Sequence, residues 1–205
     1  MDKIDFRKTM KALYAPSAKD FVLVEVPPLQ FLKHDGQGDP NTSATYVTGI
    51  NWLYSVSYAL KFASKAGLGK DYVAPPLEGL WGSDDMADFA AGRKDKWRWT
   101  QMIMVPDFIT RAMVDAALEK AGKKLGTPPP TLRFEPFSEG LSVQILHVGR
   151  YADEAPTIKR LHTEFIPAQG LRENGFHHEI YLSDPRKTAP EKLKTIIRQP
   201  VARAG

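Results

Sequence analysis

The sequence predicts an α+β fold in which one strand-helix-strand-strand unit occurs twice. Three observations predict it: strand-like segments alternate with helical spacing, the order of elements recurs in the second half, and proline or glycine closes most segments. We expect a pseudo-twofold relation between the halves. We also expect an antiparallel sheet with helices on one face and a ligand trough on the other.

The first half opens with a polar stretch over residues 1–20, which we expect to be a loosely attached arm or a short helix. Helical spacing with a wide apolar face predicts a helix over 41–66 that ends at Gly67, and Asp107 is expected to cap a second helix. Turn-forming residues fill 35–40, and 83–92 is an acidic loop or short helix. The segments expected to be extended are 21–26, 29–34, 72–81 and 97–105.

The second half repeats this order with a shorter helical part, which begins at Asp153 and has Pro156 early in it. The segments expected to be extended are 131–137, 141–148, 176–182 and 192–199, the last closed by Pro200. The predicted organisation is therefore an arm over 1–20 and one domain over 21–201, followed by a tail over 202–205. The domain consists of repeats at about 21–122 and 131–201.

The repeat predicts which side chains share a face. Gly79 and Trp81 correspond to Glu179 and Tyr181, and His34 corresponds to His147. Because side chains alternate along a strand, each pair points to one side of its sheet. If the units pack edge to edge, aromatic rings from both halves and one carboxylate, that of Glu179, line the trough. Such a site suits a flat, apolar or cationic ligand, and burial should raise the pKa of Glu179 toward neutrality.

Four sequence blocks carry a resemblance to a known family. They are Pro27-Pro28-Leu29, Asp35-Gly36-Gln37-Gly38-Asp39-Pro40, Pro75-Pro76-Leu77-Glu78-Gly79-Leu80-Trp81 and His177-His178-Glu179-Ile180-Tyr181-Leu182-Ser183-Asp184-Pro185. Together the blocks resemble the stand-alone members of the GyrI-like small-molecule-binding family, over roughly residues 20–201. That family has a duplicated strand-helix-strand-strand fold, in agreement with the repeat.

The resemblance implies a ligand pocket between the two units. In multidrug-sensing regulators of this family a buried Glu meets cationic aromatic drugs, and Glu179 matches that position. Some stand-alone members hydrolyse the cyclopropane ring of DNA-alkylating compounds, which implies Glu179 as the catalytic general base, with Trp81 and Tyr181 beside the substrate. The chain is thus expected to be a xenobiotic-detoxifying hydrolase or a multidrug-binding protein.

The predicted site consists of catalytic Glu179 and the ligand-binding residues Trp81, Tyr181, Trp97, Trp99, Gly79 and His147. For each there is a structural alternative. Glu179 could face solvent on an edge strand, and the aromatic rings could belong to the core. The contributions of His34, His147, His177 and His178 are left open by the sequence.

Other function classes find little support in the composition. A net charge of +4 over 205 residues is mild, so direct nucleic-acid binding is not expected. With no cysteine and no His-Glu ligand spacing, neither a metal nor a cofactor is expected. No apolar span or signal peptide is visible, which predicts a cytoplasmic protein. We expect a monomer or weak dimer. Two alternatives remain: a non-catalytic module that sequesters aromatic ligands, and a protein-interaction module that contacts and inhibits DNA gyrase.

Overall fold

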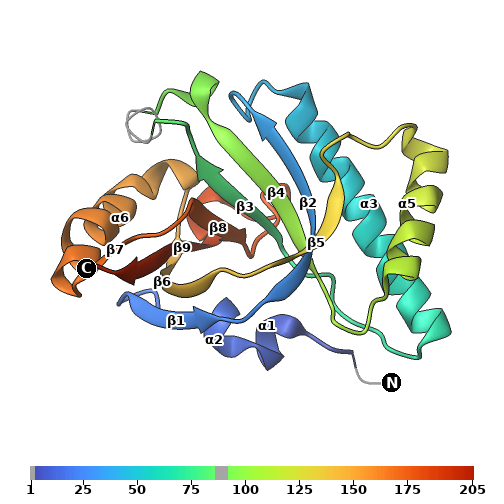
Figure 1. The fold of residues 1–205 in the computed structure, drawn as a ribbon, viewed down its shortest axis with the longest axis horizontal. Helices are drawn as coiled ribbons and strands as arrows, with labels where there is room; N and C mark the ends of the chain where they lie inside the picture. Colours follow the sequence, from blue (N-terminus) through green and yellow to red (C-terminus); the bar gives the residue numbers. More distant parts are fainter. Residues whose placement is uncertain (1–2, 86–91) are drawn as a thin grey trace. The chain divides into compact units, whose positions relative to one another are not determined.

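The computed structural model describes residues 3–85 and 92–205. The chain forms two compact units. Figure 1 shows the ribbon coloured by residue number. Unit 1 contains residues 1–9 and 29–137, and unit 2 contains residues 10–28 and 138–205. Part of the acidic segment predicted at 83–92 lies outside the described residues. Within each unit the neighbouring strands pair antiparallel.

Unit 1 has four strands in the order β3-β4-β2-β5, all antiparallel. They are β2 (Leu29–Gln37), β3 (Leu77–Gly82), β4 (Arg98–Val105) and β5 (Arg133–Phe137). The helical elements are α1 (Phe6–Thr9), α3 (Ala44–Gly67), η1 (Lys94–Lys96) and α5 (Arg111–Leu125). Helix α3 packs on β2, β4 and α5, as the predicted apolar face of 41–66 requires. Its buried residues include Trp52, Leu53 and Leu60.

Unit 2 has its main strands in the order β1-β6-β9-β8, and β7 pairs separately with β9. The strands are β1 (Val22–Val26), β6 (Gly140–Val148), β7 (Leu171–Glu173), β8 (His177–Tyr181) and β9 (Lys194–Arg203). The helical elements are α2 (Lys11–Tyr14), η2 (Tyr151–Asp153), α6 (Ala155–Arg160), the π-helical turn η3 (Leu161–Phe165), α7 (Ile166–Ala168) and η4 (Pro190–Lys192).

The two faces of the unit 2 sheet carry different groups. One face is apolar, where Ile145 and Ile197 pack with Leu161 of η3. The opposite face holds a buried polar network: Arg198 donates to Glu139 over 3.1 Å and to the Leu13 carbonyl over 2.7 Å. This network fixes α2 to the sheet. Residues 1–20 were expected to form a loosely attached arm or a short helix; the structure has the short helices α1 and α2 there, and Leu13 and Tyr14 of α2 are buried.

The predicted duplication and fold class are confirmed. Strands β2, β3 and β4 with helix α3 in unit 1 match β6, β8 and β9 with the α6-η3-α7 segment in unit 2, and the sheet orders correspond. A fourth strand completes each sheet, β5 beside β2 and β1 beside β6. Strand β1 precedes β2 in the chain but belongs to unit 2, so the units differ from repeats beginning at 21 and 131.

The two halves align differently from the sequence prediction in one strand. Strands β2 and β6 have the same burial pattern, and it places His34 at the position of Ile145 and Gly36 at that of His147. The cross-strand partners agree, because Gly79 pairs with Gln101, which pairs with His34, while Glu179 pairs with Ile197, which pairs with Ile145. The expected equivalence of His34 and His147 is thus wrong by two residues.

Three predicted element ends are also wrong, each for a local reason. Strand β2 continues through Gly36 to Gln37, because Gly36 there accommodates a ring rather than a turn. Helix α5 is capped by Thr110, whose hydroxyl accepts from the Met113 N–H, and not by Asp107. Strand β9 passes Pro200, which lies where pairing with β6 ends and pairing with β7 begins, so its missing N–H disrupts neither ladder.

Candidate functional site

Strand β8 presents Glu179 together with its two same-face neighbours. His177, Glu179 and Tyr181 alternate onto one side of the strand. The Tyr181 hydroxyl donates to Glu179 Oε2 over 2.7 Å, and His177 Nε2 lies 3.2 Å from Glu179 Oε1. The Glu179 side chain is only 16% exposed, so the predicted solvent-facing alternative does not hold. Each carboxylate oxygen is thus held by a different side chain of the same strand.

The electrostatics of Glu179 differ from the prediction. Burial alone would raise its pKa, but the hydrogen bond and charge of His177 and the hydroxyl of Tyr181 outweigh burial and hold the pKa below the usual range. The expected rise toward neutrality is therefore wrong. Glu179 is an ionised carboxylate at neutral pH, and it is permanently available as a base or as a counter-charge.

A second carboxyl, which the sequence did not suggest, faces Glu179. Glu154 immediately precedes α6, is 3% exposed and has no hydrogen-bond partner for Oε1 within the described chain. Burial, followed by repulsion from Glu179, raises the pKa of Glu154 to about 8, although the neighbouring Thr195 hydroxyl opposes the rise. Glu154 therefore carries a proton at neutral pH. The only sequence signal was its place at a helix start, which says nothing about the strand it faces.

Aromatic and imidazole rings extend the site on both sides of Glu179. The Tyr151 and Tyr181 rings meet edge to face with centroids 5.8 Å apart. On the His177 side, the ring centroids of His162 and His177 are 6.5 Å apart. We call one group of residues the Glu179 site. Its members are Tyr151, Glu154, His177, Glu179, Tyr181 and Thr195. All of them belong to unit 2.

The other histidines singled out by the sequence have separate positions. His147 is the cross-strand partner of Thr195, and its Nε2 lies 3.1 Å from the Arg150 carbonyl. His178 points to the opposite face from Glu179, where its Nδ1 lies 2.7 Å from Glu139. The pKa of Glu139 is lowered: burial would raise it, but His178 and Arg198 outweigh burial. His178 is therefore part of the structural network that holds α2.

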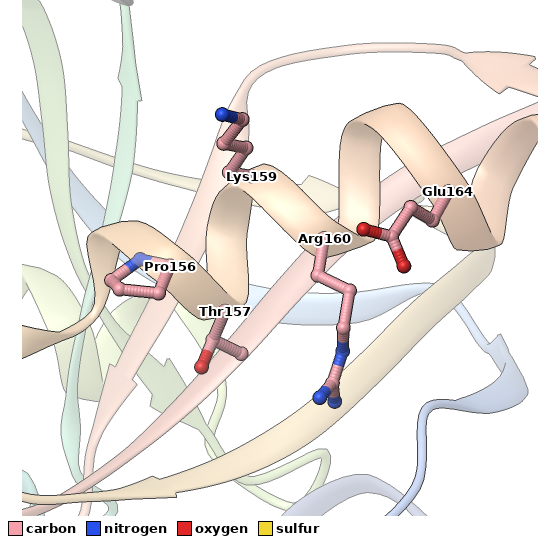
Figure 2. A pocket seen from close by; sticks show the side chains of 5 residues that line it. All are labelled: Pro156, Thr157, Lys159, Arg160 and Glu164. Atoms are coloured by element: carbon pink, nitrogen blue, oxygen red, sulfur yellow. The ribbon is translucent and has the colours of Figure 1, made fainter.

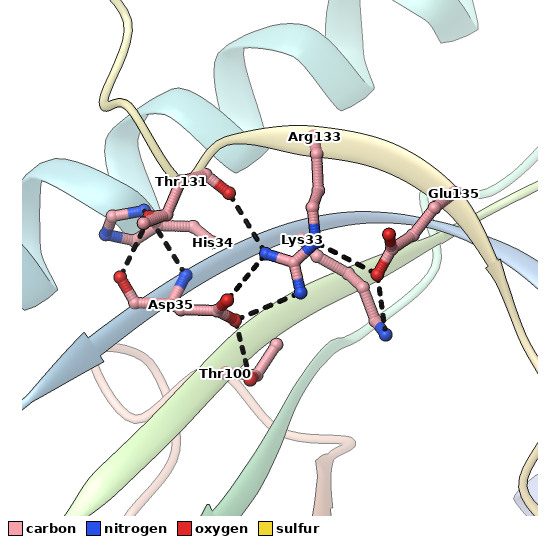
Figure 3. Close-up of polar contacts among 7 residues, drawn as sticks. All are labelled: Lys33, His34, Asp35, Thr100, Thr131, Arg133 and Glu135. Atoms are coloured by element: carbon pink, nitrogen blue, oxygen red, sulfur yellow. Dashed lines mark hydrogen bonds and ion pairs between the residues drawn. The ribbon is translucent and has the colours of Figure 1, made fainter.

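His34 lies in a polar cluster of unit 1 that joins β2 to β4 and β5 (Figure 3). Its Nδ1 is 2.8 Å from the Thr131 hydroxyl, which also donates to the Asp35 carbonyl. Arg133 binds the Asp35 carboxylate through two nitrogens, at 2.8 and 3.2 Å. Burial lowers the pKa of His34. The cluster holds β5 in place and contains none of the predicted site residues.

The predicted tryptophans of unit 1 form one aromatic cluster. It also contains Tyr46, which was not among the predicted site residues. The Tyr46 ring, at the start of α3, lies 6.0 Å from Trp81 and 4.9 Å from Trp99, and Trp97 lies 5.8 Å from Trp81. Trp99 covers Gly36 and donates its indole N–H to the Gly38 carbonyl. Trp99 therefore has a core role, as the structural alternative stated.

The candidate residues lie on the helix-bearing face of their own unit. Trp81 and Trp99 contact Tyr46 of α3, and Gly79 shares their face. Glu179 shares the face of Ile197, which packs with η3. These residues were expected on the face without helices, so this expectation is wrong.

A pocket of about 360 Å³ lies elsewhere, along α6 and the start of η3 (Figure 2). Its lining residues are Pro156, Thr157, Lys159, Arg160 and Glu164. All come from one helical segment, most are exposed, and none belongs to the Glu179 site. We therefore do not assign the ligand site to this pocket.

Among residues 3–85 and 92–205, no three His, Asp or Glu side chains gather closely enough to hold a metal ion. Within the same described ranges, no helix is sufficiently long and apolar to cross a bilayer.

Comparison with known proteins gives both a family and a set of folds. The model of the GyrI-like small molecule binding domain matches residues 19–202. An uncharacterised conserved protein and a hydrolase, both from Listeria innocua, are each 40% identical; either alignment covers 98% of this chain and 100% of the other, with TM-scores of 0.86 and 0.82. The C-terminal domain of EcmrR shares the fold at 14% identity and a TM-score of 0.57, over 90% of this chain and 98% of its own. No curated protein matches the chain.

Proposed function

The chain belongs to the family of GyrI-like small-molecule-binding domains, and on this premise we propose that it binds planar aromatic compounds at the Glu179 site and opens their cyclopropane rings by hydrolysis. The 40% identical hydrolase from Listeria innocua supports an enzymatic role. The observation that carries the proposal is the ionised Glu179, buried and held through both oxygens beside aromatic rings.

Glu179 is the general base of the proposed reaction. It takes a proton from a water molecule while the water oxygen bonds to a carbon of the strained ring. The C–C bond of the ring breaks, and its electron pair moves to the electron-withdrawing group that activates the ring. That group then takes the proton from Glu179, which returns to its carboxylate form, so that one water molecule is added in total. The low pKa of Glu179 makes it a weak base, so the reaction requires an already electrophilic substrate. Positioned general-base catalysis contributes roughly 10²–10⁴-fold in such cases.

The neighbours of Glu179 give it a fixed direction. Tyr181 and His177 each hold one oxygen, so the carboxylate has little rotational freedom and one face left for water. Tyr151 and Tyr181 offer ring surfaces for a flat substrate.

Glu179→Gln tests the proposal, because it preserves shape and removes the base. We expect hydration of a cyclopropane-containing alkylating compound, detected by mass spectrometry as the water adduct, to fall by about 10²-fold or more. Glu191→Gln is the matched control, since Glu191 is exposed in η4, and it should retain the parent rate. An unchanged rate in Glu179→Gln would exclude Glu179 as the base.

A second candidate function is sequestration without turnover. The observation that favours it is again the lowered pKa of Glu179, which suits a permanent counter-charge for a cationic ring better than a strong base. The same mass measurement separates the two functions. If the compound is bound but recovered unhydrated after long incubation with excess protein, the chain is a binding module.

A further inference from the structure

Glu154 is a buried acid that the fold itself does not account for. Glu139 is comparably buried, but it is neutralised by Arg198 and contacts His178. Glu154 has no such neighbour: within the described residues no Lys, Arg or His forms an ion pair with it, and Oε1 accepts no hydrogen bond. Burying a carboxyl without a partner is unfavourable, so its retention requires an explanation outside the fold.

The position of Glu154 points to the ligand site. Thr195, beside Glu154, is the cross-strand partner of Tyr181, and Tyr181 holds Glu179. The Thr195 hydroxyl is fully buried beside Glu154, whose charged form it favours, and it has no other hydrogen-bond partner in the described part of the chain. Two buried polar groups with no partner beyond each other therefore border the carboxylate that the proposed function uses. We expect a molecule that enters this site to bond to both.

Two carboxyl groups that face one another in a dry site do not both ionise. The one with hydrogen-bond donors keeps the negative charge, and here this is Glu179, which has Tyr181 and His177. The one without donors keeps the proton. A cation that binds between the two carboxyl groups changes which of them are ionised, because its positive charge compensates a negative charge on Glu154 in addition to that on Glu179.

We propose that the Glu179 site is a proton-exchanging cation site: in the empty protein Glu154 carries a proton, and a planar aromatic cation displaces this proton and is bound by both carboxylates. This rests on the proposed function, because it uses the same site and ligand class. The balance is simple: the cation enters, one proton leaves Glu154 for solvent, and the net charge of the site is conserved.

Several titratable groups face the pair and enter the test. Strand β8 contributes His177 and Tyr181, η2 contributes Tyr151, and η3 contributes His162, which lies 2.6 Å from Glu173 of β7. The proton release that is measured is the sum over all groups at the site. The contribution of Glu154 must therefore be isolated by substitution, and Glu154→Gln does this with little change of shape.

The probe is 10-methylacridinium, a flat ring with a permanent charge, and phenazine is the neutral ring of the same shape. Binding is followed by titration calorimetry in buffers of different ionisation enthalpy, which reports the protons released. Since the pKa of Glu154 is about 8, we expect the parent affinity to rise by up to about tenfold per pH unit below pH 8 and to level off above it. At pH 7 nearly one proton should be released.

Glu154→Gln should bind the cation as the parent does near pH 6 and at least about tenfold more weakly at pH 9, and it should release markedly less than one proton at pH 7. Asp153→Asn is the matched control: it removes an exposed charge one residue away and should follow the parent profile. Phenazine should show no pH dependence due to Glu154. Circular dichroism verifies that each variant is folded.

Superimposable pH profiles of the parent and Glu154→Gln for the cation would overturn the inference and leave the proposed function intact. Absence of binding for both rings at every pH would overturn the inference together with the function on which it rests. An infrared band of a protonated carboxylic acid at pH 7, present in the free parent and lost in Glu154→Gln, is the expected independent readout. Its absence from the parent also contradicts the inference.

Discussion

At the scale of the residue, Gly36 shows how a missing side chain shapes the aromatic cluster of unit 1. A Cβ at this position would lie 2.1 Å from a ring carbon of Trp99, far inside van der Waals contact. Trp99 in turn touches Tyr46, which also contacts Trp81. The glycine is thus required for close approach of a ring, although its sequence context resembled a turn.

Gly36→Ala should therefore displace Trp99 and lower the free energy of unfolding by about 1–3 kcal/mol, as overpacking of a core does. Urea unfolding followed by tryptophan fluorescence measures this change. Gly67→Ala is the control, because no atom lies within 4 Å of a Cβ there, and it should not destabilise the protein. Equal stability of Gly36→Ala and the parent would contradict the packing account.

The same scale shows what sequence reasoning could and could not find in the site. Glu179 and Tyr181 follow from strand alternation and the family motif, and the structure brings them into contact. Glu154 could not be found, because its approach to Glu179 depends on how the start of α6 packs against the rest of unit 2. The direction of the Glu179 pKa was also missed, since it is set by His177, whose role the sequence left open.

At the scale of the element, the short helix α2 is held by contacts remote in sequence. Arg198 of β9 donates to the Leu13 carbonyl, and Gln144 of β6 donates to the Ala12 carbonyl. Both donors are buried and are tied to Glu139 or to each other. These bonds satisfy carbonyls in the last turn of α2, which have no partner within so short a helix.

Arg198→Leu should release α2 and leave the buried Glu139 without one of the two groups that stabilise its charge, which costs about 3–5 kcal/mol. Limited proteolysis is expected to cut near residues 10–20 in this variant but not in the parent. Arg203→Leu, an exposed change on the same strand, serves as the control. If the arm stays protected in a folded Arg198→Leu protein, the network is not what holds α2.

Elements differed in how far the sequence determined them. Helix α3 was predicted nearly to its ends, because its apolar stripe is long and Ser43 supplies a cap, accepting from the Tyr46 N–H. Strand β7 was not predicted at all, since its three residues are strand only through pairing with β9. Local pattern thus determined long elements, whereas short ones depend on tertiary partners.

At the scale of the whole molecule, each unit is assembled from separate stretches of chain. Val26 at the end of β1 is the cross-strand partner of Gly140 at the start of β6, and Leu29 and Phe137 are partners in the same way within unit 1. In unit 2, residues 28 and 138 therefore lie where a tight hairpin would connect β1 to β6. The repeat in the sequence predicted the duplication but not this exchange of strands.

A fragment of residues 138–205 should consequently fail to fold, because it lacks β1 and α2. Joining 10–28 to 138–205 through a short glycine-containing turn should restore a cooperative unit. Circular dichroism during urea unfolding distinguishes the two proteins. A sigmoidal transition of the 138–205 fragment alone would show that β1 is dispensable for unit 2.

The exchange of β1 also has a consequence for how the protein is made. Translation adds roughly 5–20 residues per second, and β6 follows β1 by more than a hundred residues. For several seconds, β1 emerges from the ribosome as an apolar segment whose partner has not been synthesised. During that interval the nascent chain depends on Glu25 and the two prolines after Val26 to discourage pairing with neighbouring polypeptides, or on a chaperone to shield it.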